Sequence, residues 1–129
     1  MSDQTQRFTC IVCPLGCPLT VTKPSGGAPV EVSGNRCRRG LEYGRTEASD
    51  PRRVLTTTIT LAGAGLRRLP VKTAAPIPKN LLPAAAEALR QVRATAPVRV
   101  GEVILPDLLG TGVPVVATRE IPAGPADRR

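Results

Sequence analysis

The sequence predicts a small α+β protein in which a cysteine-rich N-terminal lobe precedes a β-rich lobe with one helix. Two observations carry this prediction. All four cysteines of the 129-residue chain lie within its first 37 residues. Beyond them, short runs of β-branched residues alternate with turns rich in glycine and proline. We therefore assign residues 1–50 to a cysteine-rich cluster-binding lobe, residues 51–120 to a β-rich lobe and residues 121–129 to a disordered tail.

The chain is expected to begin with a loose polar tail over residues 1–7, followed by an irregular loop that holds the first three cysteines. Pro14, Gly16 and Pro18 lie among these cysteines. Proline removes a backbone donor and glycine favours tight bends, so regular structure is excluded from this loop.

A β-hairpin and a short helix are predicted to complete the first lobe. Residues 19–22 and 30–32 each alternate apolar and polar side chains, as half-buried strands do. The intervening residues 23–29 read Lys-Pro-Ser-Gly-Gly-Ala-Pro, which is typical of a turn. A helix within residues 40–50 is expected to end before Pro51.

Four strands are predicted in the second lobe because each run is rich in β-branched residues. They cover residues 53–61, 66–73, 98–105 and 112–118. Pro70 interrupts the second of them and predicts an edge strand, since proline cannot donate to a ladder.

One helix is predicted in the second lobe, over about residues 80–93. Apolar residues recur there at helical spacing between Leu82 and Val92. Asn80 is the candidate N-cap, and Pro83 is tolerable only within the first turn.

The four cysteines follow the pattern C-x2-C-x3-C-x19-C, formed by Cys10, Cys13, Cys17 and Cys37. The 19 residues between Cys17 and Cys37 are enough for the two strands and the turn of one hairpin. Because a hairpin reverses the chain, Cys37 is expected to lie close to the other three cysteines. Sets of four thiolates suit zinc or iron–sulfur clusters. The sequence therefore predicts that these cysteines bind a metal centre.

The spacing favours a [4Fe-4S] cluster over zinc, which remains the alternative. Zinc sites usually take two C-x2-C pairs, whereas only Cys10 and Cys13 form one here. Three thiolates from one short loop and a fourth from afar are typical of a cubane cluster, as is proline directly after a ligand cysteine. Pro14 and Pro18 occupy that position. A thiol-redox role for the C-x2-C pair Cys10 and Cys13 is a further alternative, although the pair lacks the strand-then-helix context of a thioredoxin-like motif.

The composition makes independent catalysis and nucleic-acid binding less favoured functions. The sequence has no histidine, so it lacks the commonest general base. Its net charge of +8 would suit an anionic partner. With one Phe and one Tyr, the chain lacks an aromatic pair for base stacking, so nucleic acid is not favoured as a partner. No apolar run is long enough to span a bilayer, and the polar N-terminus lacks the apolar stretch of a signal peptide. The expected compartment is the reducing cytoplasm, where clustered cysteines are metal ligands more often than disulfides.

At residues 8–44 the chain resembles the N-terminal [4Fe-4S] segment of molybdopterin oxidoreductases, whose pattern is C-x2-C-x3-C, a hairpin, then a cysteine and a basic-Gly pair. Arg39 and Gly40 match that pair. The resemblance implies that Arg39 lies beside the cofactor. The several hundred residues that hold the pterin in that family have no counterpart here.

Nearly the whole chain resembles an uncharacterised family of small proteins with paired CxxC cysteines. The resemblance rests on Cys-x2-Cys-Pro-x-Gly-Cys and the Arg39-Gly40 pair, and also on residues 55–58, 69–73, 76–79 and 112–118. Members of that family are similar to companions of FAD-dependent dehydrogenases related to glycerol-3-phosphate dehydrogenase, and of NAD(P)/FAD oxidoreductases. The resemblance implies an electron-transfer subunit or accessory protein that passes electrons between flavin and an acceptor. Catalysis by the chain alone is not expected, because the sequence has no histidine and no Gly-rich phosphate loop.

Some basic residues fit two interpretations. Arg38 and Arg39 either dock an anionic patch beside the cluster or lie in a solvated loop. Lys72 and Lys79 either contact a partner flavoprotein or solvate a strand. The alternative function is a zinc-stapled module that binds protein or nucleic acid and has no redox role.

Overall fold

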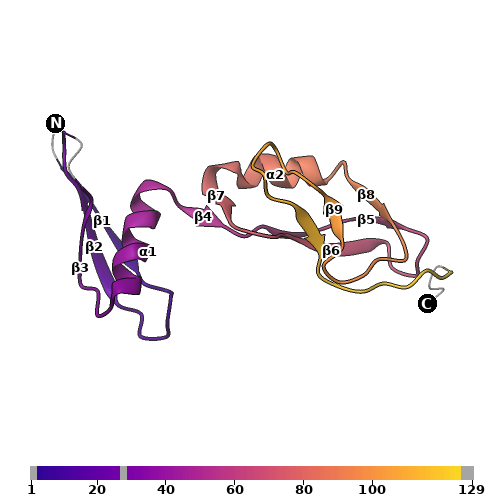
Figure 1. Ribbon diagram of the computed structural model, residues 1–129, viewed down its shortest axis with the longest axis horizontal. Coiled ribbons are helices and arrows are strands. Elements are labelled where there is room, and N and C mark those ends of the chain that lie inside the picture. The colour runs from indigo at the N-terminus through magenta and orange to yellow at the C-terminus, as the bar shows by residue number, and fades with distance from the viewer. Residues whose placement is uncertain (1–2, 27–28, 126–129) are drawn as a thin grey trace. The chain divides into compact units, whose positions relative to one another are not determined.

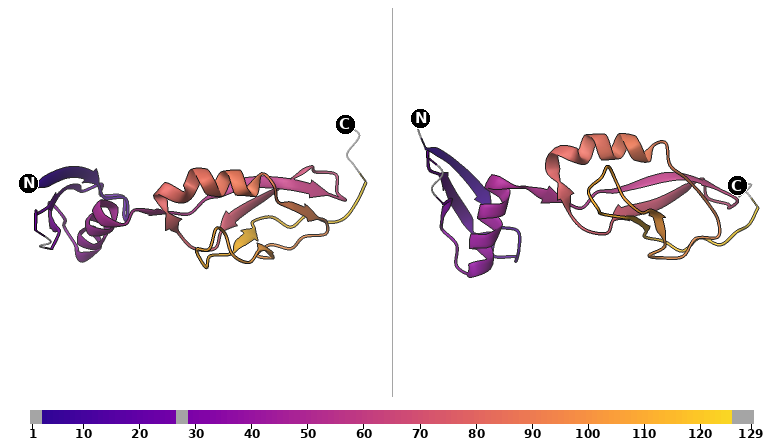
Figure 2. Two further views of the ribbon diagram at one scale, coloured as in Figure 1. Left: turned by 90° about the horizontal axis from the view of Figure 1, so that it is seen from above. Right: turned by 45° about the horizontal axis from the view of Figure 1, so that its top comes forward.

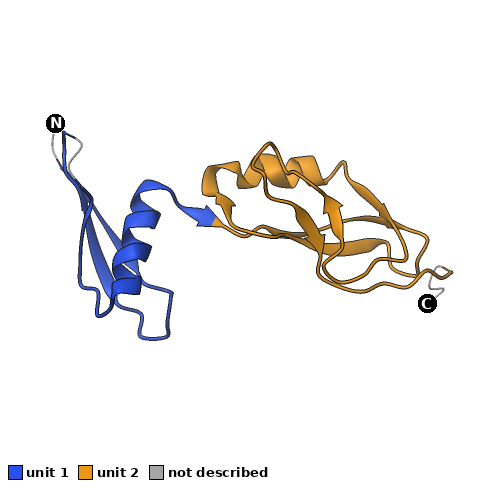
Figure 3. Ribbon diagram, in the orientation of Figure 1, with its two compact units in different colours: residues 1–52 blue, residues 53–129 orange. Residues whose placement is uncertain are grey.

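The computed structural model describes residues 3–26 and 29–125 and divides the chain into two compact units, residues 1–52 and 53–129 (Figures 1 and 3). Both units combine strands with a helix, so the predicted α+β class is confirmed. The sequence places the boundary between the lobes at residue 50, and the units divide after Arg52.

Unit 1 is a three-stranded antiparallel sheet with one helix packed on it. The sheet has the order β1-β2-β3. Its elements are β1 (Gln4–Thr9), β2 (Pro18–Lys23), β3 (Glu31–Ser33) and α1 (Arg38–Ser49). The predicted hairpin is present as β2 and β3, although residues 27–28 of its turn lie outside the described residues. The predicted helix is also present and begins two residues earlier than expected.

The loose tail expected over residues 1–7 is wrong for residues 4–7, which belong to β1 (residues 1–2 lie outside the described residues). Their side chains, Gln-Thr-Gln-Arg, are all exposed, so no apolar alternation marks the strand in the sequence. Backbone pairing with β2 holds it instead, from Gln4 opposite Lys23 to Thr9 opposite Pro18.

Helix α1 packs closely on the sheet because glycine faces it. A Cβ atom added to Gly44 would lie 3.0 Å from Val32 Cγ1 and 3.2 Å from Val21 Cγ2. Such contacts are tighter than ordinary packing, so a side chain here would push the helix outward. The buried core beneath the helix is small, and two cysteines belong to it: Cys10, Cys17, Leu19, Val21 and Ala48.

Unit 2 contains a five-stranded sheet of order β8-β5-β6-β10-β9. All neighbours are antiparallel except β5 and β8, which are parallel. The strands are β5 (Thr56–Ala62), β6 (Arg68–Thr73), β8 (Arg93–Thr95), β9 (Val103–Leu105) and β10 (Val115–Ala117). Two short strands, β4 (Arg52–Arg53) and β7 (Ile77–Pro78), form a further pair.

Helix α2 (Leu82–Leu89) follows the 3-10 turn η1 (Lys79–Leu81) and covers one face of this sheet (Figure 2). Ala85 and Leu89 are its buried residues and join the core of unit 2. That core includes Ile59, Leu69, Val71, Ile77, Val98, Leu108, Val115 and Ala117.

Strand β6 is central, so the edge position predicted from Pro70 is wrong. On one side Pro70 lies opposite Thr58 of β5. On the other side its carbonyl accepts a hydrogen bond of 3.0 Å from the amide of Thr118, one residue beyond the end of β10. The missing N–H therefore falls where the β10 ladder has already ended, and the sheet tolerates the proline.

The helix of unit 2 is shorter than predicted, and Asn80 is not its N-cap. Asn80 lies in η1, and Leu81 holds the cap position without a side-chain hydrogen bond. Pro83 lies in the first turn, as expected. After Leu89 the hydrogen bonds tighten, with the Val92 amide donating to the Leu89 carbonyl, before the chain enters β8.

The two C-terminal strands are also shorter than predicted. Gly101 at φ +82° interrupts the run 98–105, which leaves an isolated bridge at Val98 and then β9. The run 112–118 is reduced to β10. Within the tail expected to be disordered, Ile121 is buried and exchanges two 2.9 Å backbone hydrogen bonds with Val98. Residues 126–129 lie outside the described residues.

Candidate metal centre

The topology of unit 1 brings all four cysteines to one end of its sheet. Strand β1 ends at Thr9, directly before Cys10, and β2 begins at Pro18, directly after Cys17. Because β2 and β3 are antiparallel, β3 ends at this same end, and the segment 34–37 continues from it to Cys37. The 19-residue gap therefore does return Cys37 to the end of the sheet that carries the other three cysteines.

The first three cysteines lie in a loop whose two ends are fixed. The Cys10 amide donates a 2.9 Å hydrogen bond to the Cys17 carbonyl, which closes the loop at its base. Cys10 is 5% exposed and Cys17 is 8% exposed, whereas Cys13 is half-buried. Gly16 has φ +62°, a left-handed conformation in which glycine carries no steric penalty.

The segment that leads to Cys37 is tied to the loop by a close backbone approach. Gly34 has φ +89°, and a Cβ atom on it would overlap the carbonyl oxygen of Pro18. The next residue, Asn35, donates from Nδ2 to the Cys37 carbonyl over 3.2 Å. The backbone after Cys17 and the backbone before Cys37 are therefore in contact.

Cys37 is exposed and occupies the N-cap position of α1. Within the described residues its side chain makes no capping hydrogen bond, whereas its carbonyl accepts a hydrogen bond of 3.2 Å from the Gly40 amide. The backbone amide of Gly40 lowers the pKa of the Cys37 thiol the most, desolvation opposes it as the next largest effect, and Arg39 lowers the pKa through its guanidinium and its amide. A lower pKa raises the fraction of Cys37 present as the thiolate, the form that binds metals.

The thiolate preference predicts how Cys37 reacts in metal-free protein. Replacing Arg39 with glutamine should raise the pKa of Cys37 and slow its alkylation by iodoacetamide at neutral pH, because a smaller fraction of the thiol is then ionised. Arg38→Gln is the matched control: Arg38 is in the same helical turn, and its charge is offset by an exposed ion pair of 3.5 Å with Glu42. Peptide mapping of the alkylated thiols measures both rates, and equal slowing by the two substitutions would contradict the assignment.

The four thiols are free of disulfides, and their chemistry fits a metal centre with four sulfur ligands. The side chains themselves are not gathered. Within residues 3–26 and 29–125, no three Cys, Asp or Glu side chains form a group that could hold a metal ion. The structure therefore places the candidate ligands at one end of the sheet and leaves two of them in the core and one in solvent.

The remaining basic candidates have different positions. Arg39 is exposed in the first turn of α1, beside Cys37. Lys72 is exposed on β6, and Lys79 is exposed at the start of η1. Both lysines belong to unit 2. Of these four basic residues, Arg38 and Arg39 are the two that lie next to a cysteine, because they form the first turn of α1 directly after its N-cap Cys37.

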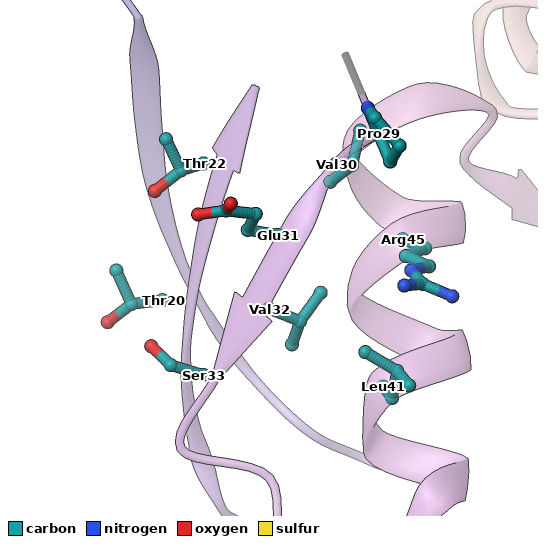
Figure 4. A pocket seen from close by; sticks show the side chains of 9 residues that line it. All are labelled: Thr20, Thr22, Pro29, Val30, Glu31, Val32, Ser33, Leu41 and Arg45. Carbon is teal, nitrogen blue, oxygen red and sulfur yellow. The ribbon is translucent and has the colours of Figure 1, made fainter. Parts of the chain in front are cut away.

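A groove of about 510 Å³ follows the outer strand of unit 1, but it is separate from the cysteines (Figure 4). Leu41 and Arg45 line it from α1, and Thr20, Val32 and Ser33 line it from strands β2 and β3. None of the residues that line it is a cysteine. A smaller hollow of about 340 Å³ lies at the Thr9–Pro18 pair, where the cysteine loop leaves the sheet.

Two features of this end of the sheet were missed by sequence reasoning. One is the close approach of Gly34 to the Pro18 carbonyl. In the sequence, only the position of this glycine in the segment before Cys37 pointed to it. The other is a set of large apolar side chains that the cysteine loop exposes: Ile11, Val12 and Leu15. Their signal was present, because the loop between Cys10 and Cys17 contains no charged residue.

No helix in the part of the chain that the structure describes is long and apolar enough to cross a membrane. Among curated proteins, none matches this sequence. A solved structure with a similar fold is the NMR structure of the Clostridium perfringens protein CPE0013. The two share 19% identity with a TM-score of 0.53, and the match covers 60% of this chain and 93% of that one. At this identity the likeness concerns the fold alone.

A family match covers residues 38–119, from the start of α1 to just beyond β10. The family is described as "Protein of unknown function (DUF1667)". The matched region begins one residue after Cys37, so the four cysteines lie outside it. Because the match includes more than half of the chain, it agrees with the resemblance to an uncharacterised family, and the chain belongs to the DUF1667 family.

Proposed function

We propose that this chain is an iron–sulfur electron-transfer subunit or accessory protein of a flavin-dependent oxidoreductase, with Cys10, Cys13, Cys17 and Cys37 as ligands of a [4Fe-4S] cluster. The observation that carries the proposal is the convergence of the cysteine loop and the Cys37 segment at one end of the sheet of unit 1. Such a cluster exchanges single electrons at a potential set by charge, hydrogen bonds and solvent exposure.

The division of the ligands supports a cluster more than a zinc ion. Three cysteines come from one loop closed by a single backbone hydrogen bond, and the fourth comes from a separate segment at a helix N-terminus. A cluster is larger than one ion and suits ligands spread in this way. A zinc site built from two C-x2-C knuckles would need a second cysteine near Cys37, and the sequence has none.

Arg39 has a specific role in the proposal. Its charge lies beside the thiol of Cys37 and lowers the pKa of that thiol. A positive charge near a cluster favours the reduced state, which carries more negative charge, so Arg39 would raise the reduction potential. Arg38 is offset by Glu42 and would have less influence.

The partner is proposed from the sequence resemblance to companions of FAD-dependent dehydrogenases and NAD(P)/FAD oxidoreductases. The chain would then carry electrons between that flavin and an acceptor, and the flavoprotein would perform the chemistry on substrate. The absence of histidine from the sequence agrees with a carrier that has no acid–base chemistry of its own. A reducing compartment such as the cytoplasm would keep the four thiols available.

Anaerobic purification tests the proposal directly. The protein is expected to be brown, to contain about four iron atoms and matching acid-labile sulfide per chain, and to give a cluster EPR signal after reduction. Zinc content is measured on the same sample. Colourless anaerobic protein with one zinc ion per chain would instead support the zinc-stapled module and would exclude the electron-transfer function.

A further inference from the structure

The cysteine loop displays an apolar surface that the fold of unit 1 does not use. Ile11 is 73% exposed and Leu15 is 65% exposed, and Val12 is exposed as well. These are all the large hydrophobic side chains that unit 1 exposes among its described residues. Three such side chains lie within five consecutive residues of one loop, which we call the apolar tip, whereas exposed hydrophobic residues on a surface are normally scattered singly.

The exposure is imposed by the structure of the loop. Cys10 and Cys17 are anchored in the core at its two ends, and the hydrogen bond between them fixes its base. Beyond the base, Thr9 and Pro18 pair as the first rung of the sheet. The tip therefore cannot fold back into the core without breaking this base, and its side chains remain in water unless another molecule covers them.

The surroundings of the tip are basic. Arg36, Arg38 and Arg39 are exposed on the segment and helical turn that flank Cys37, at the same end of the sheet as the loop. Two nearby acidic residues do not cancel this charge. Glu42 is paired with Arg38, and Glu31 lies two residues before Ser33 on β3, away from the cysteine end of the sheet. An apolar centre with a cationic rim matches a surface with an apolar recess and acidic edges.

We propose that this tip, residues 11–15, is the docking surface for the flavoprotein partner, and that it fits an apolar recess edged by acidic residues on that protein. The inference rests on the proposed function, because the loop that carries three candidate ligands would then be the part that approaches the flavin. A second copy of the chain fits poorly, since it would bring the same arginines against one another.

The test is a binding measurement between the purified protein and a purified FAD-dependent dehydrogenase of the glycerol-3-phosphate dehydrogenase type from the same organism. Leu15→Ser and Ile11→Ser are each expected to weaken binding by about tenfold or more, because buried anchors dominate interfaces. Val100→Ser is the matched control: Val100 is 65% exposed and belongs to unit 2. It should leave the affinity unchanged, and added salt should weaken binding by the wild type.

Three results would overturn the docking proposal: loop variants that bind as tightly as the wild type, a wild type that does not bind the flavoprotein, or a wild type that instead binds vesicles of equimolar phosphatidylcholine and phosphatidylglycerol. Iron content, read on the same samples, separates this proposal from the proposed function. Loop variants should keep wild-type iron, since they alter no ligand. If the purified protein contains zinc and the Leu15→Ser substitution still weakens binding, the docking surface is supported and the electron-transfer role is rejected.

Discussion

Replacing Gly34 with alanine is expected to destabilise unit 1 by about 3–4 kcal/mol, a large effect for a single small substitution outside the core. Two costs add. Gly34 has φ +89°, where an L side chain costs about 1–2 kcal/mol. Its Cβ would also overlap the carbonyl oxygen of Pro18, and backbone cannot yield as the end of a flexible side chain can. The segment before Cys37 must then separate from the residue after Cys17.

Gly26→Ala provides the matched control for Gly34→Ala. Gly26 has a similar φ of +85°, but no atom of the described residues outside its chain neighbours lies within 4 Å of the position of its Cβ. It should therefore show the backbone cost alone, about 1–2 kcal/mol. Tyr43 is the only tyrosine and the chain has no tryptophan, so tyrosine fluorescence during urea unfolding reports on unit 1 alone. Equal losses for the two variants would mean that contact with Pro18 adds nothing.

Secondary structure was predictable from the sequence where the signal was local. The hairpin of β2 and β3 has alternating side chains and a Pro-Gly turn, and α1 stops before Pro51. Strand β1 was not predictable, because its residues 4–7 are polar and exposed and only pairing with β2 makes them a strand. The central position of β6 was missed for a related reason: whether Pro70 breaks a ladder depends on where β10 ends, which is a tertiary property.

The candidate site also has features that the sequence predicts and features that depend on tertiary structure. The choice of the four cysteines and the return of Cys37 through a hairpin can be predicted from their spacing alone. Their environments do not. Cys10 and Cys17 are core residues because they flank the first rung of the sheet, whereas Cys37 is exposed because it caps a helix. The contact between Gly34 and Pro18 links non-adjacent segments, and no local pattern specifies it.

This difference in environment makes Cys37 the cysteine whose substitution separates metal binding from folding. Cys10 and Cys17 supply two of the five buried residues in the core of unit 1, so replacing either one changes packing as well as ligation. Cys37 is exposed, and within the described residues its side chain makes no capping hydrogen bond. Cys37→Ala should leave the thermal unfolding of metal-free protein unchanged.

In reconstituted protein, the same Cys37→Ala substitution is expected to remove most of the stabilisation that metal gives to unit 1. Binding free energy of a metal becomes folding free energy when the ligands converge only in the native state, and a core of five buried residues leaves unit 1 dependent on that contribution. Limited proteolysis with and without reconstitution measures it: wild type and the control Arg38→Ala should gain protection of residues 1–52, and Cys37→Ala should gain little. If Cys37→Ala were protected as well as the wild type, Cys37 would not be a ligand, and the centre would rest on the three cysteines of the loop.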